Sequence, residues 1–205
     1  MSHPVHLDVS SPARFDRIQL LLRFAITIAM GWIGATAGWV TCALFLGLPI
    51  YAAVLVSTRG PQAYVTEHGP RLWRVLHWLL AFSAYMLLLT DRFPVNEPAD
   101  VHTDLAYTGQ PTTSSALLRL ILSIPSAFVL ALLGFVSFIL YLVGAVTILA
   151  HETVPPSVLA FQRGILRWQA RLLAYHASLV DEYPPFSFDD LAQPGAHSDD
   201  RTRMV

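Results

Sequence analysis

Two long stretches of the chain contain no charged side chain, and they dominate its hydrophobic pattern. Residues 24–58 and 120–150 carry no Arg, Asp or Glu, and the whole chain lacks Lys. As straight helices these stretches would be about 46–53 Å long, whereas the hydrocarbon core of a bilayer is only about 30 Å thick. We therefore expect each stretch to form two short membrane spans joined by a tight turn.

Glycines near the centre of each stretch mark where such a hairpin would turn. Glycine permits tight turns and also lets two helices approach closely. The hairpins are accordingly assigned to residues 18–58 and 116–150. One bent or over-long helix per stretch, with the glycines as packing contacts, is the alternative. The central glycines are Gly31, Gly34, Gly38 and Gly134.

The arginines flank the apolar stretches and leave their centres free of charge. If each stretch is a hairpin, all of these arginines lie on one side of the membrane. Positive residues collect on the cytoplasmic side, so the pattern predicts a multi-pass protein of the inner (plasma) membrane with both termini in the cytoplasm. Arg23 and Arg119 lie just inside the apolar runs, and we expect their side chains to extend to the headgroups.

An amphipathic helix is expected after each hairpin, at residues 71–90 and 156–180. In the second, Arg163, Arg167 and Arg171 recur every four residues, opposite an apolar arc. This pattern is typical of a helix that lies in the membrane interface. Anionic lipid headgroups are the expected partners of these arginines, with anchoring of the topology as the alternative. The arginines assigned to this interface are Arg59, Arg71, Arg74, Arg163, Arg167 and Arg171.

The chain also repeats itself. The segment VHLDV at residues 5–9 returns as VHTDL at residues 101–105, and the same shift of 96 carries Arg23 onto Arg119. Later the shift becomes 90, and the two helices then match at a Trp, a Tyr, an Asp and a Pro at fixed spacing. The matched residues are Trp78, Tyr85, Asp91 and Pro94 in the first copy, and Trp168, Tyr175, Asp181 and Pro184 in the second.

This repeat sets the predicted organisation. We expect an all-α integral membrane protein made of two parallel repeats, with a short β-strand pair on the cytoplasmic side. Because proline cannot continue a helix, the two interfacial helices should end near Asp91 and Asp181, where each Asp could pair with a nearby Arg. The predicted segments are repeat 1 (5–94), a linker (95–100), repeat 2 (101–188) and an acidic polar tail (189–205).

Composition agrees with a membrane protein and points to no chemistry. Only 13% of the residues are charged, about half the share of a soluble domain. The net charge of −1 gives no case for nucleic acid, and the chain has no Gly-x-Ser-x-Gly motif or metal-binding His spacing. We expect no enzymatic activity, cofactor or metal. His77 is the best single candidate for a buried ligand or proton site, and His6 and His102 could meet as a structural or metal pair.

Several motifs resemble a known family. The second copy carries Ile124-Pro125, Arg167-Trp168 and an Asp-x-Tyr-Pro-Pro-Phe ending that begins at Asp181, while the first copy keeps Asp91-Arg92-Phe93-Pro94. The first copy also keeps Thr58-Arg59-Gly60-Pro61, in altered order. These residues resemble the bacterial and archaeal membrane family called domain of unknown function 4389, in two tandem copies from about residue 5 to 188. The resemblance implies a multispanning membrane protein and no particular activity.

Two functions remain open at this stage. The first is a small membrane scaffold or accessory subunit that packs against a larger membrane complex. The second is a lipid-handling or small-molecule transport protein with a cavity between the two repeats. The expected partners are membrane lipids, including anionic ones, and other membrane-protein subunits.

Overall fold

The computed structural model describes residues 3–32, 37–95 and 100–185. Its described residues are mostly helical, with one small sheet and two helical segments long and apolar enough to cross a membrane, Cys42–Arg59 and Thr113–His151. The elements are β1 (Val5–Val9), α1 (Arg17–Trp32), α2 (Ala37–Arg59), α3 (Pro61–Ala63), the π-helical turn η1 (Tyr64–His68), α4 (Gly69–Met86), β2 (Val101–Leu105), α5 (Thr113–Leu122), α6 (Ile124–His151) and α7 (Pro156–His176).

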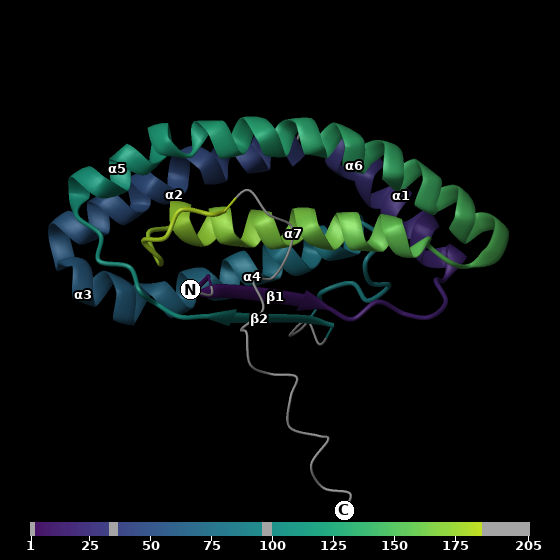
Figure 1. The fold of residues 1–205 in the computed structure, drawn as a ribbon, viewed down its shortest axis with the longest axis horizontal. Coiled ribbons are helices and arrows are strands. Elements are labelled where there is room, and N and C mark those ends of the chain that lie inside the picture. Colours follow the sequence, from purple (N-terminus) through teal and green to yellow (C-terminus); the bar gives the residue numbers. More distant parts are fainter. Residues whose placement is uncertain (1–2, 33–36, 96–99, 186–205) are drawn as a thin grey trace, which may run out of the picture.

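These elements form two layers. Helices α5 and α6 make one long arch, and the two strands lie on the other side of α7 from it (Figure 1). Helix α2 packs against α5 and α1 against α6, so the two apolar stretches lie side by side. We call α1, α2, α5 and α6 the arch layer, and α4, α7, β1 and β2 the polar layer.

The second apolar stretch is not a hairpin. Helix α6 runs unbroken through Gly134, and only Ser123 separates it from α5. The expected hairpin at residues 116–150 is therefore wrong, and the alternative of one long bent helix holds. Residues 126–150 contain no Pro, Asn or Asp to make a turn, and one glycine costs a helix only about 1 kcal/mol. A turn there would also leave backbone polar groups unpaired in apolar surroundings, which costs more.

The described parts of the first stretch do not form a hairpin of packed helices either. Helices α1 and α2 pack against different helices of the second stretch. Arg17, at the start of α1, forms an ion pair of 3.5 Å with Glu152, directly after the end of α6. The two stretches therefore run antiparallel. The centre of the expected hairpin, residues 33–36, lies outside the described residues.

The small sheet confirms the expected strand pair. Strands β1 and β2 are antiparallel, and β1 packs on α7. The side chains of Val5, Leu7 and Val9 are buried on the side that faces the helices. Successive side chains alternate between the two faces of a strand, so the polar residues between them lie on the outer face. The opposed pairs at the centre are His6 with Asp104, Leu7 with Thr103 and Asp8 with His102.

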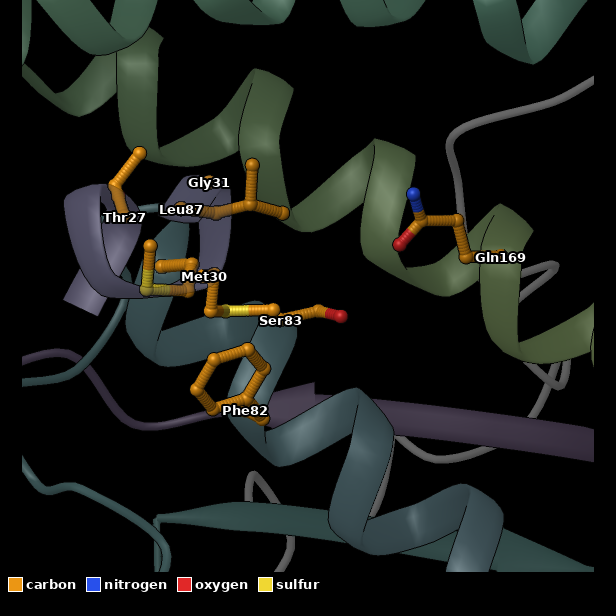
Figure 2. Close-up of a pocket in the computed structure, with 8 residues that line it drawn as sticks. Thr27, Met30, Gly31, Phe82, Ser83, Leu87 and Gln169 are labelled. Carbon is orange, nitrogen blue, oxygen red and sulfur yellow. The ribbon is translucent and has the colours of Figure 1, made fainter. Parts of the chain in front are cut away.

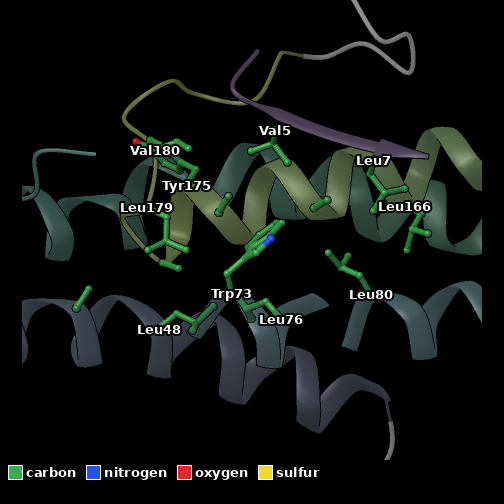
Figure 3. Close-up of a cluster of buried hydrophobic side chains, with 14 of the residues drawn as sticks. Val5, Leu7, Leu48, Trp73, Leu76, Leu80, Leu166, Tyr175, Leu179 and Val180 are labelled. Carbon is green, nitrogen blue, oxygen red and sulfur yellow. The ribbon is translucent and has the colours of Figure 1, made fainter. Parts of the chain in front are cut away.

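Helix α7 lies in the core rather than at an exposed interface. Figure 3 shows Leu166, Tyr175 and Leu179 from the α7 region facing Trp73 and Leu80 of α4, and this cluster is buried. Strand β1 covers another side of α7, and the two arch stretches adjoin it as well. The predicted interfacial helix at 156–180 is therefore wrong in its placement, because tertiary packing covers both its apolar arc and part of its arginine stripe.

Both helices of the polar layer end before the prolines that were expected to stop them. Helix α4 ends at Met86 and α7 at His176. Leu88 and Ser178 then take left-handed backbone angles, with φ of 61° and 58°. The next residue closes the turn in each case, since Leu89 N–H donates to Ala84 O and Leu179 N–H donates to Ala174 O, both at 3.0 Å. This is the Schellman arrangement of a helix end, here without glycine.

A glycine that packs tightly should tolerate no side chain. A Cβ added at Gly109 would lie 2.5 Å from Ser178 O, whereas one added at Gly134 meets nothing within 4 Å. We expect Gly109→Ala to destabilise the fold by about 1–3 kcal/mol through overpacking, measured by thermal unfolding in detergent. Gly134→Ala is the matched control and should be neutral or stabilising, because alanine favours a helix. Equal melting temperatures for the two variants would contradict this packing.

Candidate functional site

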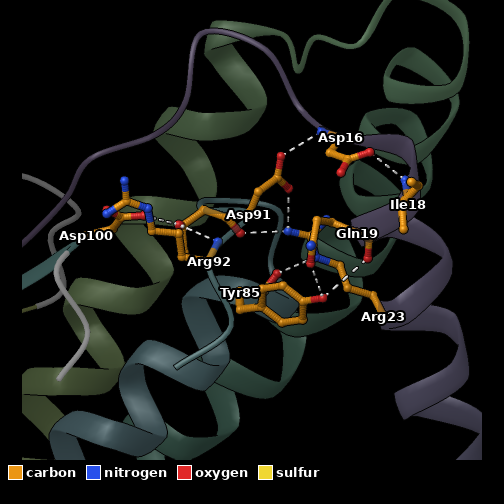
Figure 4. Close-up of polar contacts among 9 residues, drawn as sticks. Asp16, Ile18, Gln19, Arg23, Tyr85, Asp91, Arg92 and Asp100 are labelled. Atoms are coloured by element: carbon orange, nitrogen blue, oxygen red, sulfur yellow. Dashed lines mark hydrogen bonds and ion pairs between the residues drawn. The ribbon is translucent and has the colours of Figure 1, made fainter. Parts of the chain in front are cut away.

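A buried arginine links the arch layer to the polar layer. Arg23, on α1, has 0% of its surface exposed. Its Nε donates to Tyr85 O at 2.7 Å, and its Nη2 donates to Thr90 O at 2.6 Å and to Asp91 Oδ1 at 2.9 Å (Figure 4). The guanidinium also lies over the Tyr85 ring, 4.3 Å from its centroid. Arg23 thus holds the turn that ends α4.

The second stretch carries the same arrangement. Arg119, on α5, is 5% exposed. Its Nη1 donates to Tyr175 O at 2.8 Å and to Val180 O at 2.5 Å, and its Nη2 donates to Asp181 Oδ1 at 2.5 Å. The guanidinium lies 4.5 Å from the centroid of the Tyr175 ring. We call these two sets the arginine clamps, defined by Arg23, Tyr85 and Asp91, and by Arg119, Tyr175 and Asp181.

Each clamp arginine donates to a carbonyl in the last turn of a helix and to a second carbonyl in the segment after it. The helical carbonyl also accepts from the backbone, since Leu88 N–H donates to Tyr85 O at 3.3 Å and Ser178 N–H to Tyr175 O at 2.9 Å. A cation is also favoured there by the helix dipole. The expected pairing of Asp91 and Asp181 with nearby arginines is confirmed. The expectation that Arg23 and Arg119 extend to lipid headgroups is wrong, because both guanidinium groups point into the protein and bind the ends of α4 and α7.

Aromatic rings complete both clamps in the same way. The Phe93 ring meets the Tyr85 ring edge-on at 5.3 Å, and the Tyr183 ring meets the Tyr175 ring edge-on at 5.4 Å. The matched tryptophans differ, since Trp78 Nε1 donates to Pro94 O at 2.7 Å and is partly exposed, whereas Trp168 is buried. The tyrosines and aspartates of the repeat motif therefore meet at the two helix ends.

The interface arginines divide into two groups. Arg59, Arg71 and Arg74 are exposed, so contact with headgroups stays a prediction for them. Of the other three, Arg167 binds β1 and Arg163 binds Ser11, shortly after that strand. Arg163 Nη2 donates to Ser11 Oγ at 2.8 Å, and Arg167 Nε donates to Leu7 O at 3.0 Å. Arg171 is 1% exposed, so this guanidinium is held inside the protein.

The predicted packing glycines do not make the expected contacts where they are described. Nothing lies within 4 Å of the Cβ position at Gly31 or Gly134. Gly34 lies outside the described residues, and Gly38 is in α2. The close approach occurs at Gly144 instead, where a Cβ would lie 2.8 Å from Leu88 Cδ1.

The histidine candidates have structural partners. His77 Nε2 is 2.9 Å from Val101 O, which ties α4 to β2. His6 and His102 lie on the paired strands, but each is opposite an aspartate rather than opposite the other. No group of three His, Cys, Asp or Glu side chains that could hold a metal occurs in residues 3–32, 37–95 and 100–185.

A large apolar surface covers the outside of the arch layer. Along α6 the exposed side chains include Phe128, Leu132 and Phe135, the last of them 68% exposed. Trp39 of α2 is 70% exposed, and Ile28 of α1 is 65% exposed. Exposed apolar patches of this extent mark a membrane or protein interaction surface.

A cavity of about 400 Å³ lies between the arch layer and the polar layer. Figure 2 shows Met30 and Phe82 close together on its wall, with Gln169 of α7 set apart from them. The lining combines apolar side chains with the polar groups of Thr27, Ser83 and Gln169. Its residues are Thr27, Met30, Gly31, Phe82, Ser83, Met86, Leu87 and Gln169.

Sequence reasoning included a cavity between the repeats only in its alternative function and named none of the lining residues, and it missed the close contacts at Gly109 and Gly144. The cavity residues come from three helices and share no motif, so only the packing of α1, α4 and α7 identifies them. The clamps had a partial signal, since an arginine just inside an apolar run recurs in both copies at a constant shift.

Comparison with known proteins extends this picture for one part of the chain. Residues 113–187 match the family model described as "Domain of unknown function (DUF4389)". The match covers α5, α6, α7 and the second arginine clamp. No curated protein and no solved structure matches the chain.

Removing a clamp arginine should unfold the protein more readily. Arg23→Leu removes the ionic partner of Asp91 and the guanidinium donor to Tyr85 O and Thr90 O, and we expect a loss of about 3–5 kcal/mol. Arg119→Leu should cost less, because the Asp181 side chain is 45% exposed and the Asp91 side chain only 16%. The measurement is thermal unfolding in detergent. The exposed Arg74→Leu is the control and should change stability by less than about 0.5 kcal/mol. An Arg23→Leu variant as stable as this control would rule out the clamp.

A buried histidine predicts a pH dependence of stability. Burial lowers the pKa of His176, while its hydrogen bond to Phe45 O opposes that shift. Since the folded state then binds fewer protons than the unfolded state, stability should fall as the pH drops below about 6.5, the ordinary histidine pKa. Melting temperatures between pH 8 and pH 5 should decline less steeply in His176→Gln than in the unaltered protein. Parallel curves would contradict the prediction.

Proposed function

We propose that the protein is a membrane-embedded accessory subunit whose arch layer lies in the bilayer. The observation that carries this proposal is the exposed apolar surface of the arch layer, opposite a polar layer that holds the charged strands and Arg71 and Arg74. In water such a surface would promote aggregation, whereas in a lipid bilayer it is surrounded by acyl chains. The polar layer would then face the cytoplasm, as the positive-inside rule favours.

The length of the arch favours a helix that dips into the bilayer and returns. The segment from Thr113 to His151 has 39 residues and would measure about 58 Å if straight. Crossing a core of about 30 Å would require a tilt far beyond the usual ~20°. In the proposed arrangement both ends of the arch, with Arg119 near one and Glu152 at the other, lie on the same side.

We also propose that the chain is a tandem repeat whose halves are related by a pseudo-twofold axis. The register of β1 and β2 supports this, because Leu7 and Thr103, which match in the sequence repeat, lie opposite each other. The two arginine clamps support it further, since each joins its own stretch to its own helix end. In such a pair each half would bury its own clamp, at the end of α4 in the first half and at the end of α7 in the second.

The accessory role rests on the aromatic side chains of the arch layer. Phe128, Phe135 and Phe138 of α6 are each more than half exposed. Large aromatic residues are favoured anchors at protein interfaces. We therefore place a second membrane protein against α6, with lipid covering the remainder of the arch.

The embedding is tested by labelling the two ends of the arch. Cys42 is replaced by serine, and a single cysteine is introduced as Thr113→Cys or His151→Cys in the full chain. A membrane-impermeant maleimide should label both positions from the same side of sealed vesicles. Asp104→Cys, on the polar layer, is the control for that side. Labelling of Thr113→Cys and His151→Cys from opposite sides would overturn the dipping arch.

The accessory role is tested separately by photo-crosslinking in native membranes. A photoreactive phenylalanine replaces Phe135 in one variant and Phe93 in another, since Phe93 lies after the end of α4 and packs on the Tyr85 ring. Phe135 should give one protein adduct of defined mass, and Phe93 should not. Adducts with lipid alone at Phe135 would leave the embedding intact but refute the accessory role.

A lipid-handling role is the second candidate, and the cavity between α1, α4 and α7 favours it. The cavity joins residues of both halves, since Gln169 belongs to the second and the other lining residues to the first. A site of this kind could hold a membrane lipid without any further reaction.

A further inference from the structure

The cavity differs from the corresponding place in the other half of the chain. The shift of 90 that matches Tyr85 with Tyr175 also matches Met86 with His176. The His176 ring lies against the Phe45 ring, with centroids 4.6 Å apart, and its Nε2 is 2.7 Å from Phe45 O. That position is thus filled by α2, whereas Met86 lines an open space.

The walls of the cavity suit a flexible apolar ligand. Met30, Phe82, Met86 and Leu87 provide most of the lining, and methionine side chains adapt to ligands of variable shape. The volume falls within the roughly 300–1,000 Å³ of ordinary ligand pockets. Ser83 is already used, because its Oγ donates to Leu79 O at 2.9 Å. Gln169 is the remaining amide at the cavity, and it lies apart from the apolar group (Figure 2).

The position of the cavity connects it with the arch surface. Helix α1 contributes Thr27, Met30 and Gly31 to the wall, and Thr27 and Gly31 are exposed. Ile28, between them, is 65% exposed on the apolar surface. A lipid tail that lies along α1 could therefore enter without crossing the polar layer.

We propose that this cavity binds the acyl chain of one membrane lipid or fatty acid. The tail lies among Met30, Phe82 and Met86, and the Gln169 amide donates to an ester or carboxyl oxygen of the head. This site gives the lipid-handling candidate a specific ligand. It depends on the proposed embedding only because the bilayer would supply the lipid. Within the described residues the second repeat has no equivalent site, because His176 and Phe45 fill the position that corresponds to Met86.

The test uses a palmitic acid with a photoreactive diazirine near the chain end, added to the full-length protein in detergent. Adducts are mapped by mass spectrometry, and we expect them on the segments that contain Met30 and Phe82. Ser83→Leu fills the cavity and should lower these adducts about tenfold, as a loss of 1.4 kcal/mol in binding would. Ser57→Leu is the matched control, since Ser57 is exposed on α2 and also bonds to a carbonyl of its own helix.

A second variant keeps the test decisive if Ser83→Leu does not fold. Gly31→Leu adds bulk where no atom lies within 4 Å of the Cβ position, and it should also lower the adducts. Adducts that fall on α6 in place of the cavity, or that persist in a folded filling variant, would overturn the proposal. Because the experiment is done in detergent, its failure would not affect the vesicle labelling of Thr113→Cys and His151→Cys, and the two results remain separable.

Discussion

The structure depends on two buried guanidinium groups that each hold the end of a helix in another layer. A charge removed from water is costly unless it is paired and hydrogen-bonded. Here carbonyls and a carboxylate accept from Nε and Nη2 of Arg23 and from both Nη atoms of Arg119, while Arg23 Nη1 has no partner among the described residues. Arg23 and Arg119 can do this only if α1 and α5 cross the ends of α4 and α7. The clamps therefore determine how the apolar stretches are positioned on the polar layer.

That constraint explains why the stretches arch over the polar layer. Each is tied down near one end by its clamp, and the start of α1 meets the end of α6 through Arg17 and Glu152. The middle of each stretch carries no charge and has few polar ties to the polar layer. Ser137 Oγ of α6 donates to Gln162 Oε1 of α7 at 2.5 Å, and His176 Nε2 lies 2.7 Å from Phe45 O of α2. The result is an apolar outer surface with polar groups gathered at its ends and beneath it.

The two arginine clamps are alike, but the spaces beside them differ. Arg23 and Arg119 bind matching atoms, and both helix ends close without glycine. Phe45 covers His176 beside the second clamp, whereas Met86 borders a cavity beside the first.

The sequence by itself determined the helical class, the strand pair and the pairing of Asp91 and Asp181 with arginine. These follow from local patterns, namely absent charge, alternation and repeated motifs at constant spacing. Only tertiary structure decided that residues 116–150 form one arch, that α7 is central and that the stripe from Arg163 to Arg171 meets β1. An apolar run has the same composition whether it turns back or continues, and an arginine stripe is equally suited to headgroups or to a strand. Packing between segments that are distant in the sequence decides between these alternatives. The local sequence pattern does not show which distant segments come into contact.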